Sequence, residues 1–556
     1  VSVATSKFGY YETFAPDMAI KMELRQNKET NTPEYWIHLR DGVFYKPLRQ
    51  KDFADDIKLS PHFLKKHQVT AHDFKFYLDA VMNPSVQEPG AVSLRSYLSD
   101  IEELKVIDDL TFTVRWKVEP FKEKDGTVVM RPKYIAKLWT GALQPLATFV
   151  YQYFPDGTKI AEGDEKNENF YRKNAIWAQN FSRHFAKNII VSCGPWIFDG
   201  FSDRQIQFKR NPNFYNPLAA LVAVKVFEFK QSSENIWQDF KSDNLDSYGI
   251  QPDQLVELEK FLKSDLYAKQ LAKGDGIERL DYVARRYVNI QWNLERPFFR
   301  SKRVRQALTM AIDRERIIKQ NMNGMGVEIT GPFFKYSKAN DNQIKPYPFD
   351  PHKARLLLEE EGWYDSDGDG IIDKEIDGKR VPFRFYLTYY VKNALGKAIS
   401  EYIATALKEV GIDCRLNGVD IADLSAAFDD KNFDALFFIW GYGSSPEDPE
   451  QLWSSSLAKV KGSSNAIGFQ NKEADEIIKK LKMEYDEEER IKLYHRFHAI
   501  IYEEAPYTFL FIPKVSLLSR QYLQNVFIPA DRQDILPEAN VQEPDISIFW
   551  IKKPDV

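Results

Sequence analysis

Cysteine is scarce in this sequence, and its scarcity excludes two kinds of site. Cys193 and Cys414 are the only cysteines among 556 residues. Two cysteines build neither a disulfide framework nor a zinc centre. Because low cysteine content suits both the cytosol and a bacterial periplasm, it does not decide the compartment.

Long hydrophobic runs and an excess of charge of one sign are also missing. No apolar run reaches the roughly 18 residues that a membrane-spanning helix needs, and residues 433–443, "FDALFFIWGYG", are short enough for a buried strand. The net charge of −5 provides no basic field for a nucleic-acid partner. The chain begins at Val1 rather than at Met, so we expect that an upstream segment, which could have carried a secretion signal, has been removed.

Catalytic signatures are absent as well. The sequence has no Walker loop, no dinucleotide-binding glycine pattern, no HExxH and no GxSxG. His495 and His498 lie on one predicted helix and could hold a metal, but a partly exposed helix face explains them more simply. A hydrolase that uses dispersed carboxylates stays open, although no pattern argues for one. We therefore predict a binding protein and not an enzyme.

Length and aromatic residues are what the sequence has in abundance. Its 28 Tyr, 39 Phe and 11 Trp indicate either ordinary core packing or a large aromatic-lined cleft. A chain of 556 residues is expected to form more than one lobe.

Hydrophobic periodicity predicts a mixed α/β chain, with strands and helices alternating in its second half. A helix over 69–82 is expected to begin after Thr70, with Asp73 as the third-position acid of a capping box. Residues 301–322 predict one amphipathic helix. The valine-rich stretch 219–229 predicts a central strand.

The acidic segment "YDSDGDGIIDKEIDG", residues 364–378, resembles a calcium-binding loop. Gly370 stands where the sharp turn of such a loop needs it, but Ile376 stands where a bidentate Glu is expected. A plain polar turn is the alternative, because Asp-Gly pairs form turns readily. If calcium binds, we expect it to serve only as a structural clip. The expected ligands are Asp365, Asp367, Asp369, Asp373 and the carbonyl of Ile371.

Four segments resemble the peptide-binding proteins of bacterial ABC importers, the peptide/nickel solute-binding family. "WIHLRDGVFY" resembles the family's F-x-L-R-x-G-V-x-W/F hairpin, and "VTAHDFKFYLDAVM" is similar to its V-T-A-E-D-V-x-F helix. "CGPWIFDGF" resembles its G-T-G-P-Y turn, with Cys193 in place of Thr. "NIQWNLERPFFRSKRVRQALTMAIDRERII" is similar to its F-N-x-x-x-P-P-F-x-D-x-R-V-R-Q-A-L-x-x-A-I-D-R stretch, and the resemblance runs from about residue 15 to 520.

The resemblance implies an α/β fold of two lobes, the periplasmic-binding-protein fold, with mixed sheets, hinge crossovers and an extra subdomain in lobe one. Lobe one is expected over 1–285 with a return segment 514–556, and lobe two over 286–513. The crossovers would lie near Tyr287–Asn293 and Tyr507–Pro513. The two cysteines would then lie in opposite lobes, so we expect no disulfide between them.

The resemblance also implies the function: an extracytoplasmic substrate-binding subunit that captures peptides between its lobes and delivers them to an ABC transporter permease. No cofactor is required, and the structural calcium ion considered above is the one bound ion for which the sequence offers ligands. We expect a monomeric periplasmic protein with no nucleic-acid partner. It would meet the membrane only through the permease or through a lipid anchor on a removed N-terminal segment. The alternatives are a binder of a metal chelate or a modified peptide, and a secreted hydrolase or chaperone on the same fold.

Ligand contacts are expected from Trp440, Tyr442 and Gly443, which match the end of a family strand that touches peptide. Trp440 offers a flat apolar wall, and a glycine backbone allows close approach. Tyr248, in a segment that resembles an edge of lobe one, is a weaker candidate. Ordinary core packing is the alternative for Trp440 and Tyr248.

The family's Asp that pairs with the peptide amine is replaced here by Gly443. Asp448, or less favourably Glu447, is expected to take over this role. The alternative is that Asp448 only caps a helix that starts at Pro449.

Overall fold

The computed structural model describes residues 2–5, 11–15, 17–123, 125–163, 169–230, 232–442, 447–527, 544 and 546–552, with only the backbone at 2–5, 11–15, 89 and 93. The chain forms two compact units, which are described one at a time. Unit 1 comprises Val1–Thr5, Tyr11–Lys230 and Ile546–Ile551, and unit 2 comprises Ser6–Tyr10, Gln231–Asp545 and Lys552–Val556. These units differ from the expected lobes 1–285 and 286–513, since residues 232–285 pack within unit 2. A compact unit is not the same as a lobe that moves as a body, so the lobe boundaries stay a prediction.

Unit 1 is built on a four-stranded antiparallel sheet in the order β3-β4-β8-β7. Its strands are β3 (Ala19–Gln26), β4 (Pro33–Leu39), β7 (Ile101–Asp108) and β8 (Thr111–Trp116). Helix α1 (Ala71–Met82) packs on this sheet, with the ring of Phe74 stacked 5.1 Å from that of Phe112. The predicted capping box is confirmed: the backbone N–H of Thr70 donates to the Asp73 carboxylate at 2.8 Å.

The remaining elements of unit 1 are short. The strands are β1 (Ser2–Thr5), β2 (Tyr11–Ala15), β5 (Phe44–Tyr45), β6 (His67–Gln68), β9 (Val118–Lys122), β10 (Val128–Pro132), β11 (Trp196–Phe201), β12 (Gln205–Arg210) and β13 (Val224–Glu228). The helices are α2 (Pro89–Leu98), α3 (Ala136–Gly141), α4 (Thr148–Tyr151), α5 (Phe170–Lys173) and α6 (Ala175–Phe181). The prediction of a central strand over 219–229 is wrong, because β13 is the edge of the three-stranded sheet β11-β12-β13 and Val224 is 44% exposed. Valine suits any pleated surface, whether buried or not.

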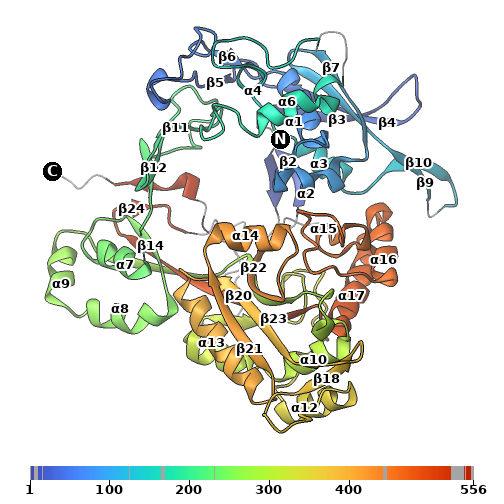
Figure 1. Cartoon of the computed structure of the whole chain (residues 1–556). Coiled ribbons are helices and arrows are strands. Elements are labelled where there is room, and N and C mark those ends of the chain that lie inside the picture. The colour runs from blue at the N-terminus through green and yellow to red at the C-terminus, as the bar shows by residue number, and fades with distance from the viewer. Residues whose placement is uncertain are drawn as a thin grey trace. The chain divides into compact units, whose positions relative to one another are not determined.

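Unit 2 contains an eight-stranded sheet with the path β14-β23-β16-β22-β20-β21, to which β15 and β17 add by pairing with β23. Figure 1 labels β14, β20, β21, β22 and β23 of this sheet. Its strands are β14 (Ser247–Ile250), β15 (Ile277–Val283), β16 (Arg286–Trp292), β17 (Gly326–Glu328), β20 (Arg384–Tyr390), β21 (Asp413–Val419), β22 (Ala435–Gly441) and β23 (Tyr507–Arg520). Strand β20 runs parallel to β21 and β22, whereas the other pairs are antiparallel. The expected mixed sheet is therefore confirmed.

Helices cover both faces of the sheet that contains β16. One core cluster joins the sheet to α10 (Lys302–Met310), α12 (Pro351–Glu360) and α13 (Ala394–Lys408). Another joins it to α14 (Ile421–Asp429), α16 (Lys472–Met483) and α17 (Glu487–Glu504). Shorter elements of unit 2 are α7 (Ser233–Lys241), α8 (Leu255–Phe261), α9 (Asp265–Ala272), α15 (Glu450–Trp453), β18 (Asp373–Ile376) and β19 (Lys379–Pro382). Side chains at the centre of this sheet are thus enclosed from both sides.

The prediction of a single helix over 301–322 is wrong. Helix α10 ends at Met310, and a new turn, α11 (Arg314–Arg316), continues as a π-helical turn over Ile317–Asn321. The break falls at Asp313, whose carboxylate accepts a hydrogen bond from the backbone N–H of Arg316 at 2.8 Å. An aspartate that caps the following turn competes with continuation of the preceding helix.

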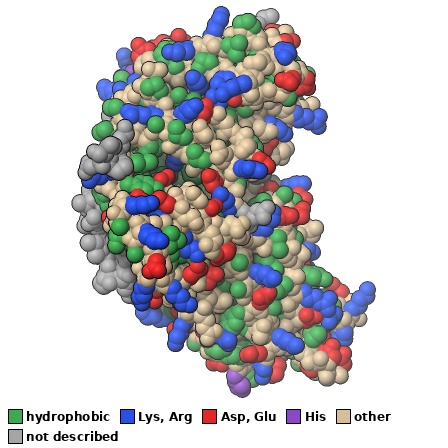
Figure 2. Space-filling model, turned by 90° about the vertical axis from the view of Figure 1, so that its left-hand side faces the viewer, with side chains coloured by type: hydrophobic (Ala, Val, Ile, Leu, Met, Phe, Trp, Pro, Cys, Tyr) green, Lys and Arg blue, Asp and Glu red, His purple; other side chains and the backbone are tan. Residues whose placement is uncertain are grey.

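Three observations bear on general properties of the chain. In the part that the structure describes, no helix combines the length and apolarity needed to cross a bilayer. Cys193 and Cys414 are both free thiols, as expected. On the face drawn in Figure 2, acidic and basic side chains are interspersed.

Candidate functional site

The two faces of β16 differ in chemistry. Val288, Ile290 and Trp292 pack in the apolar core beneath α10 and α13, whereas Tyr287, Asn289 and Gln291 alternate to the opposite face. Because β16 lies between β22 and β23, Asn289 pairs in register with Phe438 of β22, and Gln291 with Tyr507 of β23. Two amide side chains are thereby placed in the middle of a covered sheet.

The side-chain amides of Asn289 and Gln291 are buried and form no hydrogen bond with any described residue. Both residues are 0% exposed, and neither amide oxygen nor amide nitrogen has a hydrogen-bond partner among the described residues. A buried polar group without a partner costs about 1–3 kcal/mol, so such groups in a native protein indicate bound water or a ligand. Four donor and acceptor atoms on one strand therefore mark β16 as a place where polar groups other than the described side chains, water or a ligand, would bind.

Aromatic donors belong to the core cluster on the same face of the sheet as these amides. The hydroxyls of Tyr287, Tyr442 and Tyr507 and the indole N–H of Trp440 are likewise buried without a well-formed hydrogen bond to a described residue. The ring centroids of Tyr287 and Tyr442 lie 4.9 Å apart. Burial raises the pKa of all three tyrosine hydroxyls above their usual value. They are therefore neutral near pH 7 and available as hydrogen-bond donors.

One acid stands beside these aromatic groups. Glu447 is half-buried, and its backbone carbonyl accepts a hydrogen bond from the Tyr494 hydroxyl at 2.6 Å. Burial raises the pKa of Glu447 to about 7, against the opposing effect of the Arg285 guanidinium. The backbone N–H of Tyr442 donates to the Arg285 carbonyl at 2.9 Å, which connects this pair to the end of β22. The Glu447 carboxyl can therefore act near pH 7 either as a hydrogen-bond donor or as the partner of a cation.

We refer to Tyr287, Asn289, Gln291, Trp440, Tyr442, Glu447 and Tyr507 as the polar cluster. Two predicted ligand contacts, Trp440 and Tyr442, belong to it. Gly443 lies outside the described residues. The Asp448 carboxylate accepts a hydrogen bond from the backbone N–H of Glu450, the first residue of α15, at 3.0 Å. This bond is the one that the helix-capping alternative requires, and a role of Asp448 toward an amine stays a prediction.

Tyr248 lies elsewhere in unit 2, on β14. It is 7% exposed, and its ring stacks 5.9 Å from that of Trp237 in a separate core cluster. Its hydroxyl donates to Gln254 at 2.6 Å. The packing alternative describes its observed surroundings, and a contact of Tyr248 with ligand stays a prediction.

Sequence reasoning missed the amides of β16. The signal was present, because "YVNIQW" alternates Asn289 and Gln291 with apolar residues. A strand covered by helices on both faces is normally apolar on both. Alternating amides in such a strand are therefore a marker of a polar interior site.

The acidic segment forms a compact turn in unit 2, before β18. Carboxylate oxygens of Asp365, Asp367 and Asp373 lie within 4.8 Å of one another, which suits a shared cation. Asp369 lies outside this group, and its carboxylate accepts a hydrogen bond from the backbone N–H of Ile371 at 2.8 Å. Three of the predicted ligands are thus brought together.

The same turn is also stabilised without an ion. The Asp365 carboxylate accepts hydrogen bonds from the backbone N–H groups of Gly368 and Gly370, at 2.8 and 3.0 Å. The Arg380 guanidinium lies 2.9 Å from Asp373 and already supplies a positive charge. Both the calcium hypothesis and the polar-turn alternative therefore remain consistent with this geometry.

His498 departs from its predicted surroundings. It is 0% exposed, so the expectation of a partly exposed helix face is wrong for this residue. Its Nδ1 accepts the backbone N–H of Asp341 at 3.1 Å, which leaves Nε2, 3.0 Å from the Thr330 hydroxyl, as the nitrogen that carries the proton. Burial lowers its pKa to about 4. Both ring nitrogens are engaged, so His498 serves to hold the 330–341 segment and not to bind a metal with His495.

A family model of bacterial extracellular solute-binding proteins, family 5, matches residues 13–463 of the chain. Among curated proteins, the oligopeptide-binding protein AppA of Bacillus subtilis (strain 168) is 32% identical over 249 residues, 44% of this chain and 45% of AppA. The nickel-binding periplasmic protein of Escherichia coli (strain K12) is 25% identical over 365 residues, 63% of this chain and 65% of that protein. The heme-binding protein A of Haemophilus influenzae is 25% identical over 319 residues, 57% of this chain and 53% of that protein. The chain thus spans about half the length of the first curated relatives that it matches.

Solved structures share the fold. AppA from Bacillus subtilis in complex with a nonapeptide matches with a TM-score of 0.70 at 19% identity, over 99% of this chain and 97% of that one. NikZ from Campylobacter jejuni in complex with Ni(L-His) matches with a TM-score of 0.64 at 20% identity, over 94% and 90%. These likenesses confirm the predicted mixed α/β fold of periplasmic binding proteins, and the family match confirms the resemblance drawn from the motifs.

Proposed function

Because the chain belongs to family 5 of the bacterial extracellular solute-binding proteins, we propose that it is the substrate-binding subunit of an ABC importer and that its ligand is a peptide. The family is defined by solute binding, so the prediction that the chain is not an enzyme is confirmed. The peptide, the permease that would receive it and a periplasmic location are parts of the proposal. A relative described as oligopeptide-binding supports them.

The polar cluster is the observation that carries the peptide assignment. A peptide presents N–H donors and C=O acceptors at short intervals, and a primary amide offers one complementary group of each kind. Asn289 and Gln291 are two such amides, both without partners among the described residues. Trp440 and Tyr442 add apolar area with polar tips, as is usual at binding sites. Because both amides are 0% exposed, a peptide would reach them through bridging water or by displacing the side chains that cover them, and would then satisfy groups that the chain itself leaves unsatisfied.

Charge argues against an anionic metal chelate as the ligand. The titratable groups of the polar cluster are three neutral tyrosines and Glu447, and Arg285 is the cation that acts on Glu447. An anionic chelate would meet a carboxyl group, whereas a peptide amine would be attracted by it. We propose that Glu447 or Asp448 takes over the amine-binding role of the missing family aspartate. Nickel- and heme-binding relatives keep the chelate as the competing candidate.

Ligand exchange followed by mass spectrometry tests the proposal. Protein would be unfolded, refolded without ligand, and titrated with tripeptides, their N-acetylated forms and nickel–histidine. We expect saturable binding of peptides, a higher melting temperature with peptide through mass action, and no change in the peptide's mass. If Glu447 binds the amine, Glu447→Gln lowers the affinity for tripeptides with a free amine and leaves the affinity for N-acetylated tripeptides unchanged. Binding of nickel–histidine without any peptide would overturn the peptide assignment, and peptide cleavage that survives repurification would contradict a binding protein.

We also propose that the turn at Asp365 binds calcium as a structural clip of unit 2. The clustering of three carboxylates supports this proposal. The ion would cross-link residues before and inside β18 and would have no part in ligand capture. Calcium titration of unfolding, described in the Discussion, separates this proposal from the polar-turn alternative.

A further inference from the structure

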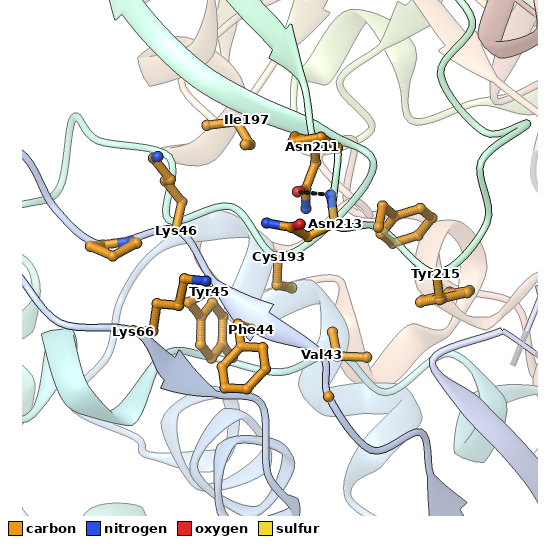
Figure 3. Close-up of a pocket in the computed structure, with 14 residues that line it drawn as sticks. Val43, Phe44, Tyr45, Lys46, Lys66, Cys193, Ile197, Asn211, Asn213 and Tyr215 are labelled. Carbon is orange, nitrogen blue, oxygen red and sulfur yellow. Dashed lines mark hydrogen bonds between the residues drawn. The ribbon is translucent and has the colours of Figure 1, made fainter.

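Unit 1 contains a cavity of about 400 Å³ (Figure 3). One wall comes from the segment that includes β5 and from Lys66, which precedes β6, the antiparallel partner of β5. The opposite wall comes from the chain that enters β11 and from residues that follow β12. Every lining residue belongs to unit 1, so the cavity is independent of the polar cluster. Its volume is within the range of small-molecule sites.

The cavity walls are held by main-chain hydrogen bonds. The backbone N–H of Lys46 donates to the Ser192 carbonyl at 2.8 Å and ties the two walls together. The Asn211 side chain donates to the Gly194 carbonyl at 3.0 Å and accepts the backbone N–H of Asn213 at 3.1 Å, the bond drawn in Figure 3. A wall fixed in this way is formed before a ligand arrives, which reduces the entropic cost of binding.

The charge of the lining is positive. Lys46 and Lys66 contribute ammonium groups, and no carboxylate lines the cavity. Neither lysine forms an ion pair with a carboxylate in the described part of the chain. Three acids lie near the region. Asp17 accepts a hydrogen bond from Tyr215 and Asp41 accepts one from Gln68. Buried Asp73, whose charge acts on the Cys193 thiol, accepts hydrogen bonds from the backbone N–H groups of Thr70 and Thr148. The lining therefore favours an anion.

The remaining lining is aromatic and apolar. Phe44 is 42% exposed, and the rings of Phe214 and Tyr215 lie 4.2 Å apart on the opposite wall. Cys193 belongs to the wall formed by the chain that enters β11, and burial raises the pKa of its thiol to about 11, so the thiol is neutral near pH 7. Exposed aromatic rings that border a cavity offer a planar ligand stacking and apolar contact. The chemistry is that of an aromatic ring joined to an anion.

We propose that this cavity is a second binding site of the protein, which accepts an aryl carboxylate, with the ring against Phe44 and Phe214 and the carboxylate between Lys46 and Lys66. This site is additional to the peptide site of unit 2. The shared ligand chemistry, an aromatic ring with a nearby carboxylate, could come from a free aryl acid or from the C-terminal phenylalanine of a peptide. The lysines recognise the charge, and the aromatic walls recognise the ring.

Protection of Cys193 from alkylation locates binding at this site. Ligand-free protein would be treated with iodoacetamide at mildly alkaline pH, and modification of each cysteine would be followed by mass spectrometry. We expect 3-phenylpropanoate to slow alkylation of Cys193 in a saturable manner. Cys414, which is buried in unit 2, serves as the internal reference. The neutral 3-phenylpropanamide tests whether binding needs the carboxylate, and hexanoate tests whether it needs the aromatic ring. N-acetylphenylalanine tests whether the C-terminal residue of a peptide can be the ligand.

Substitution of the lysines makes the test specific. Lys46→Gln and Lys66→Gln should each lower the affinity for 3-phenylpropanoate by about three- to tenfold, as expected for the loss of a partly exposed charge-assisted hydrogen bond. Neither substitution should change the affinity for the neutral amide. Lys105→Gln, on the exposed part of β7, is the matched control and should change nothing. Equal protection by acid and amide, no protection by millimolar acid, or unchanged affinity in both lysine variants would overturn the proposal. Peptide binding to the polar cluster is measured separately, so failure of one site does not imply failure of the other.

Discussion

Replacing the amides of β16 that lack hydrogen-bond partners within the described part of the chain by apolar side chains of similar shape should make the protein more stable and lower its affinity for the peptide. The changes are Gln291→Met and Asn289→Leu. Both positions are 0% exposed and neighbour aromatic or aliphatic side chains on β22 and β23. Removal of a buried residue's polar atoms normally destabilises a protein, because those atoms are normally paired. Here they have no partner among the described residues, so the sign should reverse.

The magnitude follows from the cost of unpaired polar groups. A buried donor or acceptor without a partner costs about 1–3 kcal/mol, and its replacement by an apolar group of the same shape removes that cost. Each substitution should therefore raise the free energy of unfolding of the ligand-free protein by about 1–3 kcal/mol, and by less where bound water already satisfies the amide. If the amides bind peptide, each loss should also weaken affinity by about ten- to a hundredfold, at about 1.4 kcal/mol per factor of ten.

Chemical denaturation of ligand-stripped protein and calorimetric titration with a tripeptide measure the two effects. Gln254→Met is a matched control, because Gln254 is also buried but its amide oxygen accepts a hydrogen bond from Tyr248 at 2.6 Å. That control should lower the free energy of unfolding by about 1–3 kcal/mol. It should leave affinity unchanged if Tyr248 serves only in packing, as its surroundings in unit 2 describe. The reasoning is refuted if Gln291→Met destabilises the protein as Gln254→Met does and leaves peptide affinity intact.

Three further predictions concern stability. Neutral His498 should add about 3 kcal/mol to the free energy of unfolding above pH 6.5, and this contribution should be lost as the pH falls to about 4, because its pKa is lowered from 6.5 to about 4 and only the unfolded state takes up the proton in that window. Denaturation of wild type and His498→Gln across pH 4–7 measures the difference in stability, and a difference that does not change with pH would contradict this prediction. Gly331→Ala should destabilise the protein by about 1–3 kcal/mol or more, because the added Cβ would overlap the His498 ring. Gly90→Ala in helix α2 is the control, since its Cβ meets no atom within 4 Å, and it should be neutral or stabilising when both variants are compared by thermal unfolding. Calcium should raise the melting temperature of the wild-type protein, and a chelator should reverse this rise. Asp365→Asn, which changes a proposed ligand, should abolish the rise, whereas the control Asp377→Asn should keep it. No rise in the wild type would favour the polar-turn alternative.

The family and the mixed α/β fold could be inferred from local sequence patterns. The capping box at Thr70 and Asp73 depends on residues three positions apart, and the structure forms it as predicted. The long stretch after Asn289 carried the family resemblance without any knowledge of tertiary contacts. By contrast, the helix expected over 301–322 was interrupted because Asp313 caps the next turn, a local competition that hydrophobic periodicity does not reveal.

The sequence by itself determined the class of protein and the positions of most helices and strands, while the ligand contacts that it suggests at Trp440 and Tyr442 stay predictions. Only the tertiary structure decided which polar groups lack partners, because hydrogen-bond satisfaction depends on strands far apart in the chain. It placed Tyr248 in a satisfied core and Asn289 and Gln291 in an unsatisfied one, although all three are buried residues of one sheet. It also brought Lys46, Lys66 and Cys193 to one cavity, since a short strand pair and two distant turns enclose a volume that no sequence interval defines.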